Sequence, residues 1–160
     1  MKINKTYRSL LDKSIASMLS AIEIYNKPNF GYREETFAIL AVNAWELIFK
    51  AIVLKQNQYR LRSLYVLKPC TNKDGTKSTT RKYVDKNRSG NPKTISILET
   101  LAILKNHNYL PLNLCENVEM LIELRDNSIH FTNMEDISRN VQELGFACIK
   151  TVSYTHLRAH

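Results

Sequence analysis

One stretch of this sequence restricts the possible folds more than any other. Drawn as a helix, residues 34–56 are apolar almost all round. Between residues 36 and 54 the only strongly polar side chains are Asn43, Glu46 and Lys50, which are spaced by three and four and form a single stripe. A helix of this kind has to be enclosed by other helices. The stretch therefore predicts the central helix of an all-α bundle, with Glu46 and Lys50 in register for an ion pair.

Four further segments have apolar residues at steps of three and four, which is typical of amphipathic helices. They are residues 6–26, 94–106, 113–131 and 134–150. Ser96 with Glu99, and Asn113 with Glu116, have the spacing that marks a helix start. We therefore expect one domain over residues 1–151, an up-and-down bundle of about five helices.

The connection between the second and third helices, residues 60–93, interrupts the helical pattern. Residues 61–68 alternate in polarity up to Pro69, residues 73–76 offer a turn, and residues 79–84 suit a return strand. The pattern predicts a small β-hairpin inserted into the bundle.

The same insertion carries the whole excess of positive charge. It holds ten basic and two acidic residues, and the rest of the chain holds 13 of each sign, against a net charge of +8. A neutral body with one basic arm attracts polyanions such as RNA. A solvated, Lys-rich surface loop is the alternative. The residues that we expect to contact RNA are Lys77, Arg81, Lys82, Lys86 and Arg88.

Other features narrow the class of protein by what the sequence lacks. The cysteines, Cys70, Cys115 and Cys148, are odd in number and widely spaced, which argues against a disulfide framework and a zinc knuckle. A cytoplasmic location is the simplest expectation. We see no apolar stretch near the ~20 residues that span a bilayer and no secretory signal, so no membrane is expected. Neither metal-ligand spacing nor a Gly-rich phosphate loop is present, so we expect no metal and no cofactor.

The clearest candidate for chemistry lies at the end of the fourth helix. The apolar stripe through Val118 and Leu121 should continue at position 125, where the sequence has Arg125 instead. Asp126 and His130 follow, so a polar site is expected at the edge of the core. The structural alternatives are a histidine that interacts with the last carbonyls of the helix and an Arg125 salt bridge. The possible salt-bridge partners are Glu119, Glu123 and Asp126.

These residues resemble the signature of the HEPN superfamily, the "higher eukaryotes and prokaryotes nucleotide-binding" helical bundles. That signature is an Arg, a polar residue, a short variable stretch and a His at the end of a late helix. Arg125, Asp126 and His130 match its shortest spacing, and the resemblance covers residues 6–150, including the apolar helix around residues 45–50. The long basic insertion departs from the family pattern.

The resemblance implies a metal-independent RNA endonuclease that acts as a homodimer, in one of the bacterial branches of that superfamily. Toxin–antitoxin, abortive-infection or other phage-defence systems are the implied setting, with a cognate antitoxin or defence-system protein as a possible partner. His130 would be the general acid or base, since an imidazole titrates near neutral pH. Arg125 would stabilise the anionic transition state, and Asp126 would orient one of the two.

Three further residues are weaker candidates for the cleft: Asn127, Glu46 and Lys50. For Glu46 and Lys50 the alternative is a solvated stripe. Two other functions remain open at this point. One is a non-catalytic module that binds RNA or a nucleotide, and the other is a helical domain that binds a protein partner through its basic hairpin.

The last nine residues, 152–160, resemble the translation of a transposase adapter used in sequencing libraries. We therefore expect a non-native tail, with the native sequence departing from this one after Thr151. A ragged terminus without function is the alternative. Under both interpretations His156 and His160 carry no chemistry.

Overall fold

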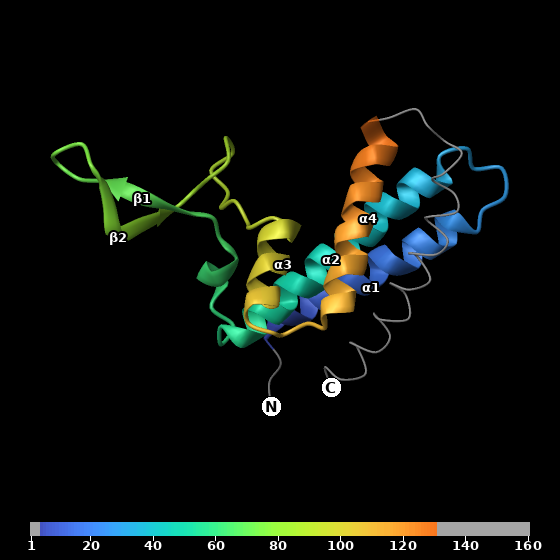
Figure 1. Cartoon of the computed structure of the whole chain (residues 1–160), viewed down its shortest axis with the longest axis horizontal. Helices are drawn as coiled ribbons and strands as arrows, with labels where there is room; N and C mark the ends of the chain where they lie inside the picture. Colours follow the sequence, from blue (N-terminus) through green and yellow to red (C-terminus); the bar gives the residue numbers. More distant parts are fainter. Residues whose placement is uncertain (1–3, 131–160) are drawn as a thin grey trace.

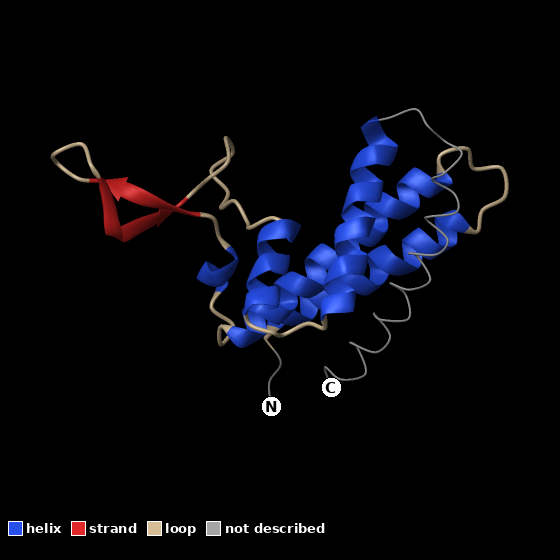
Figure 2. Cartoon of the chain, viewed as in Figure 1, coloured by secondary structure: helices blue, strands red, loops and turns tan. Residues whose placement is uncertain are grey.

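The structure, a computed structural model, describes the backbone of residues 4–130 and the side chains of residues 4–127. Within this range the chain is largely helical, with a bundle and a projecting arm (Figure 1, Figure 2). The bundle contains α1 (Lys5–Tyr25), α2 (Arg33–Gln56), α3 (Ile97–Asn106) and α4 (Leu112–His130). The arm contains the 3-10 helix η1 (Leu61–Leu64) and an antiparallel sheet of β1 (Leu67–Thr71) and β2 (Lys77–Val84). The expected fifth helix, 134–150, and the tail, 152–160, lie outside the described residues.

The central helix is α2, as its sequence predicts. The helices α1, α3 and α4 all pack on it, and the side chains of Trp45, Phe49 and Leu54 are fully buried between them. Contrary to our expectation, α2 is long and apolar enough to cross a membrane by length and composition alone. In the bundle, however, 67% of its most apolar stretch is buried, as in the core helix of a globular protein.

Small residues bring α1 and α2 close together. The hydroxyls of Ser14 and Ser17 donate hydrogen bonds of 2.8 Å to the backbone carbonyls of Ala44 and Leu40. Ala21, on the next turn of α1, is also fully buried. The α1 face that packs on α2 therefore includes two serines.

The direction of α3 departs from a simple up-and-down order. The arm carries the chain back along the bundle, so α2 and α3 run in the same sense and α4 returns in the opposite one (Figure 1). A long connection makes such parallel neighbours possible. As a result, α2 and α3 end together at the lower end of the bundle, and α4 ends at the upper end.

The arm also differs in detail from the expected hairpin. Residues 61–64 form η1 instead of a strand, because Leu64 turns inward and is buried against the bundle. Pro69 lies inside β1, opposite Lys82, where it was expected to end the strand. A proline is tolerated there because both strands of a two-stranded sheet are edge strands.

The two predicted helix starts have different outcomes. Ser96 and Glu99 form a complete capping box at the start of α3, and the two hydrogen bonds to Glu99 from Ser96 lower the pKa of this carboxyl. The helix expected from residue 113 is α4, which starts one residue earlier at Leu112, so Asn113 is not its cap. The amides of Leu114 and Cys115 donate to the carbonyl oxygen of Pro111, so the helical hydrogen bonding begins there.

Candidate functional site

The position of Arg125 is the one that the sequence predicts. Leu114, Val118 and Leu121 form a buried stripe on α4, and Arg125 takes the next place in it. Its side chain is 26% exposed, and Nη2 lies 2.8 Å from Oδ1 of Asp126. The salt bridge to Asp126 that was expected as an alternative is therefore present, with Nε donating to the same carboxylate oxygen.

The backbone of α4 continues without a break from Arg125 through His130, whose side chain lies outside the described residues. Five helical residues rotate by about 500°, so positions 125 and 130 lie about 140° apart around the axis. The helix does not end between them. Within a single chain the two positions therefore face in different directions. Asn127, between them, is exposed.

Glu46 and Lys50 form the ion pair that their spacing predicts. The ammonium Nζ of Lys50 lies 2.5 Å from Oε1 of Glu46 and 2.9 Å from Oγ1 of Thr94. Lys50 is buried, so the solvated-stripe alternative is wrong for this residue. Thr94 pairs with Tyr65 at the base of the arm. The pair thus ties the arm to the bundle.

This ion pair does not share a site with Arg125. It belongs to the second half of α2, and α4 runs antiparallel to α2 and ends near its start (Figure 1). From the start of α2 at Arg33 to Lys50 the helix axis rises by about 26 Å. The described residues thus place the second-tier candidates Glu46 and Lys50 away from Arg125.

Asp85 holds the base of the arm together. Its Oδ2 atom lies 3.0 Å from Nζ of Lys93 and 3.0 Å from Nζ of Lys68. Backbone hydrogen bonds join the same segments, from the Asp85 amide to the Val66 carbonyl and from the Lys93 amide to the Asp85 carbonyl. Hydrogen bonds from Lys93 and Lys68 lower the pKa of Asp85, and the bond to Asp85 raises the pKa of Lys68.

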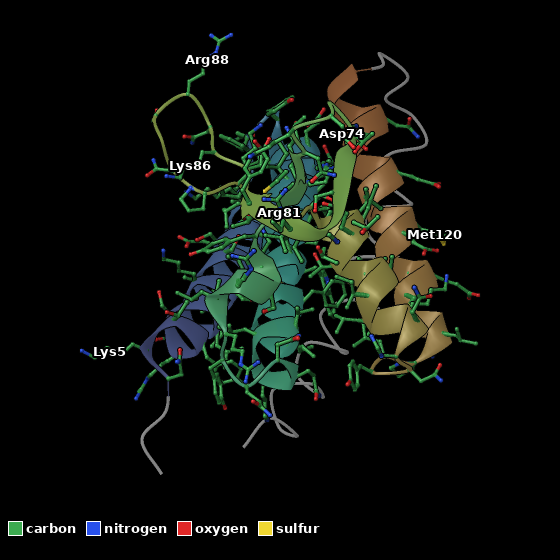
Figure 3. The ribbon with its side chains drawn as sticks, turned by 90° about the vertical axis from the view of Figure 1, so that its left-hand side faces the viewer. Lys5, Asp74, Arg81, Lys86, Arg88 and Met120 are labelled. Atoms are coloured by element: carbon green, nitrogen blue, oxygen red, sulfur yellow. The ribbon has the colours of Figure 1, made fainter. Side chains whose placement is uncertain are left out.

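The five predicted RNA contacts are all exposed side chains of the arm. Arg81 donates a hydrogen bond of 2.7 Å from Nη2 to Oδ1 of Asn72. Because the Asn72 amide is neutral, this bond does not compensate the positive charge of Arg81. The other four form no ion pair within the described part of the chain. Figure 3 shows Arg81 on the hairpin, Lys86 at the start of the next loop and Arg88 pointing away from the bundle. The arm is therefore a cationic projection on which a polyanion can collect.

Sequence reasoning missed the structural roles of the two acidic residues of the arm. Asp85 forms the clamp just described. Asp74 accepts hydrogen bonds from the amide and hydroxyl of Thr76 in the tip turn, which lower the pKa of Asp74. An Asp two residues before Thr in a turn segment was the available signal for Asp74. The sequence contains no such local signal for Asp85, because its two lysine partners lie 17 residues before it and eight residues after it along the chain.

Comparison with known proteins adds a family. The sequence model of a family described as a domain of unknown function (DUF3644) matches residues 9–156. The match includes nearly all of the bundle, the whole arm and the end of α4. No curated protein and no solved structure matches this sequence.

Proposed function

This chain belongs to the DUF3644 family, and we propose that it is a metal-independent RNA endonuclease of HEPN type. The observation that carries the proposal is the place of Arg125. Its guanidinium extends a buried apolar stripe, yet 26% of the side chain remains exposed at the end of a bundle helix. A permanent charge at the edge of a core is unfavourable for packing, so a functional reason is expected.

The chemistry needs only proton transfer and charge stabilisation. In RNA the 2′-hydroxyl attacks the adjacent phosphorus, which releases the 5′-oxygen and leaves a 2′,3′-cyclic phosphate. One group takes the proton from the 2′-hydroxyl, and another gives a proton to the departing 5′-oxygen. Arg125 stabilises the extra negative charge on the phosphoryl oxygens, held in place by Asp126. His130 supplies the acid or the base.

A homodimer provides both proton-transfer groups. Because positions 125 and 130 face in different directions on one helix, Arg125 of one chain and His130 of a second chain complete a shared cleft. Two-fold symmetry then supplies two imidazoles, one as base and one as acid. The arm binds the RNA outside this cleft through Lys77, Arg81, Lys82, Lys86 and Arg88.

A second candidate is an RNA-binding module without cleavage. Its support is the hydrogen bonding of Arg125, since both Nε and Nη2 are engaged by Asp126. In this case the cations of the arm supply affinity for the RNA backbone, and Arg125 only holds a phosphate.

RNA cleavage by the His130→Ala variant distinguishes the nuclease from the RNA-binding module without cleavage. We expect His130→Ala and Arg125→Ala to abolish RNA cleavage in buffer with EDTA and to leave RNA binding nearly intact. His156→Ala, in the segment expected to have no function, is the matched control and should cleave normally. The cleaved ends should carry the 2′,3′-cyclic phosphate. Undiminished cleavage by His130→Ala would contradict the nuclease, and binding without any cleavage would support the second candidate.

The cellular setting that we propose is a bacterial toxin–antitoxin, abortive-infection or other phage-defence system in the cytoplasm, without membrane contact. A protein that neutralises the nuclease would then be its partner. Expression of the unaltered chain, but not of His130→Ala, is expected to arrest bacterial growth. Growth arrest by both would mean that toxicity does not come from cleavage.

A further inference from the structure

A cavity of about 290 Å³ lies at the C-terminal ends of α2 and α3. These ends are at the lower end of the bundle, whereas α4, with Arg125 in its last two turns, ends at the upper end (Figure 1). The last turns of α2 and α3 and the start of the arm at η1 enclose it, with apolar side chains such as Val53 and Leu104 among its lining. Its volume lies just below the range of about 300–1,000 Å³ that is typical of sites for drug-sized ligands. The cavity therefore has room for one small ring system.

Two aromatic rings border this cavity side by side. His107 and Tyr109 are stacked with their centroids 5.5 Å apart and their planes at 24°. Asn108 between them has a positive φ of 55°, in the left-handed region, and reverses the chain at the end of α3. The Tyr109 amide donates to the Leu104 carbonyl and closes this turn. Tyr109 is 45% exposed, so the pair offers an accessible surface for stacking.

Hydrogen-bonding groups without charge line the rest of the cavity. The side-chain amide of Gln56 makes no hydrogen bond to any described residue, and Asn57 uses only its Nδ2 atom, which donates to the Val53 carbonyl. Ser63 contributes a hydroxyl, whose proton goes to the Arg60 carbonyl. A side-chain amide presents a donor and an acceptor together, which is the pattern at the edge of a nucleobase.

The lining of the cavity, within residues 4–127, offers a phosphate no Lys or Arg to bind it. Among the described residues no Lys, Arg, Asp or Glu lines it. Two helix C-termini border it, at Asn57 after α2 and at His107 after α3, and each carries partial negative charge. Lys55 and Lys105 lie in the last turns of these helices but do not line the cavity. A neutral ring with hydrogen-bonding groups therefore fits the lining better than an anion does.

We propose that this cavity binds a nucleobase, which stacks on Tyr109 and is read at its edge by Gln56. The base belongs to a free nucleoside or nucleotide, or to one nucleotide of a bound RNA. In both cases the phosphate stays outside the cavity. This site is separate from Arg125 and His130, so it stands whether or not the chain cleaves RNA.

The direct test is calorimetric titration of the full chain with adenosine, guanosine, cytidine and uridine, and with a short oligoribonucleotide. We expect Tyr109→Leu to weaken binding of the preferred base about tenfold, since one stacked ring accounts for a loss of that order. Gln56→Ala should change the preference among the four bases. Tyr32→Leu is the matched control, because Tyr32 is 48% exposed and lies outside the cavity, and this variant should bind normally.

The outcomes separate the two sources of the base. Nucleoside binding that is lost in Tyr109→Leu and unchanged between about 50 and 500 mM salt assigns a free nucleoside or nucleotide, because no charge lines the cavity. Oligoribonucleotide binding alone, weakened by Tyr109→Leu, assigns a base within RNA. The proposal is overturned if no nucleoside binds and Tyr109→Leu and Tyr32→Leu affect oligoribonucleotide binding equally. Cleavage is measured separately with His130→Ala, so failure of either proposal leaves the other intact.

Discussion

Two ion pairs of this chain have the same i, i+4 spacing and different surroundings. Lys50 is buried and contacts both Glu46, at 2.5 Å, and Thr94. Arg8 and Asp12 on α1 are 4.0 Å apart, and their side chains are 70% and 68% exposed. Exposed pairs contribute little, because water screens them and long side chains lose entropy. A buried cation that loses its partner costs much more.

We therefore expect Glu46→Gln to lower the free energy of unfolding by about 1–2 kcal/mol, a value reduced because Glu46 is 30% exposed. Asp12→Asn, the matched control, should change it by less than about 0.5 kcal/mol. Lys50→Met should cost less than Glu46→Gln, because it removes the buried charge itself. Urea unfolding followed by circular dichroism measures all three. Equal effects of Glu46→Gln and Asp12→Asn would contradict this account.

At the scale of residues only part of this ion pair could be predicted from the sequence. The spacing of Glu46 and Lys50 predicted their contact, because neighbours on a helix are local in sequence. The burial of Lys50 could not be predicted in the same way. It depends on Thr94, which lies 44 residues further along the chain and reaches Lys50 only through the fold of the arm.

The base of the arm depends on ionised groups. Above the ordinary Asp pKa of about 3.9, the Asp85 carboxylate is charged and bound by Lys68 and Lys93. Because folding lowers the pKa of Asp85, its stabilisation is present above that ordinary value and is lost as the pH falls through the lowered one. Folding raises the pKa of Lys68, so its contribution persists until the pH rises through that raised value.

Acidification should therefore loosen the base of the arm before it unfolds the bundle. We expect the protection factors of the Asp85 and Lys93 amides against hydrogen exchange to stay constant from neutral pH to about pH 4 and then to fall. Amides in α2 are the internal reference. In Asp85→Asn the protection at neutral pH should already be low and should not depend on pH. A parallel acid-induced loss in Asp85→Asn would exclude the carboxylate as the cause.

Elements with strong local signals were the ones that the sequence predicted best. The apolar pattern of α2 and the Ser96–Glu99 spacing of the capping box each lie within one segment of the chain, so both are visible in the sequence. The return strand expected at residues 79–84 lies within β2. The first strand of the arm was misplaced, because the burial of Leu64 turns residues 61–64 into η1 and the strand begins only at Leu67. The prediction of the buried face of α1 was also incomplete. It left out Ser14 and Ser17, whose hydroxyls are buried because they donate hydrogen bonds to backbone carbonyls of α2. Apolar residues at helical spacing indicate the buried face of a helix, but they do not identify buried serines.

In the function that we propose, the cations of the arm, and not those of the body, bind the RNA. Replacing Lys77, Lys82 and Lys86 by Gln should weaken RNA binding and reduce the slope of log K against log salt, by up to about one unit for each lost phosphate contact. The control replaces Lys5, Lys13 and Lys27 on the body by Gln, with the same change in net charge. Fluorescence anisotropy at several salt concentrations measures both. Equal losses in the two triple variants would mean that net charge, and not the arm, drives binding.

At the scale of the whole molecule the sequence predicted a helical body and its basic insertion from composition and pattern alone. The direction of α3 was not predictable, because nothing local shows that the arm returns the chain along the bundle. The relation of Arg125 to His130 also needed the structure. Only the unbroken backbone of α4 shows that their positions face apart on one chain.

The parallel course of α2 and α3 has a consequence for where a bound strand would be cut. It brings the Tyr109 cavity to one extremity of α4, and Arg125 lies near the other, along a helix of 19 residues. Such a helix is about 28 Å long. An RNA whose base enters the cavity while its backbone reaches Arg125 would be severed at a constant interval from the recognised nucleotide. Lengthening α4 by whole turns should then move the scissile bond along the strand.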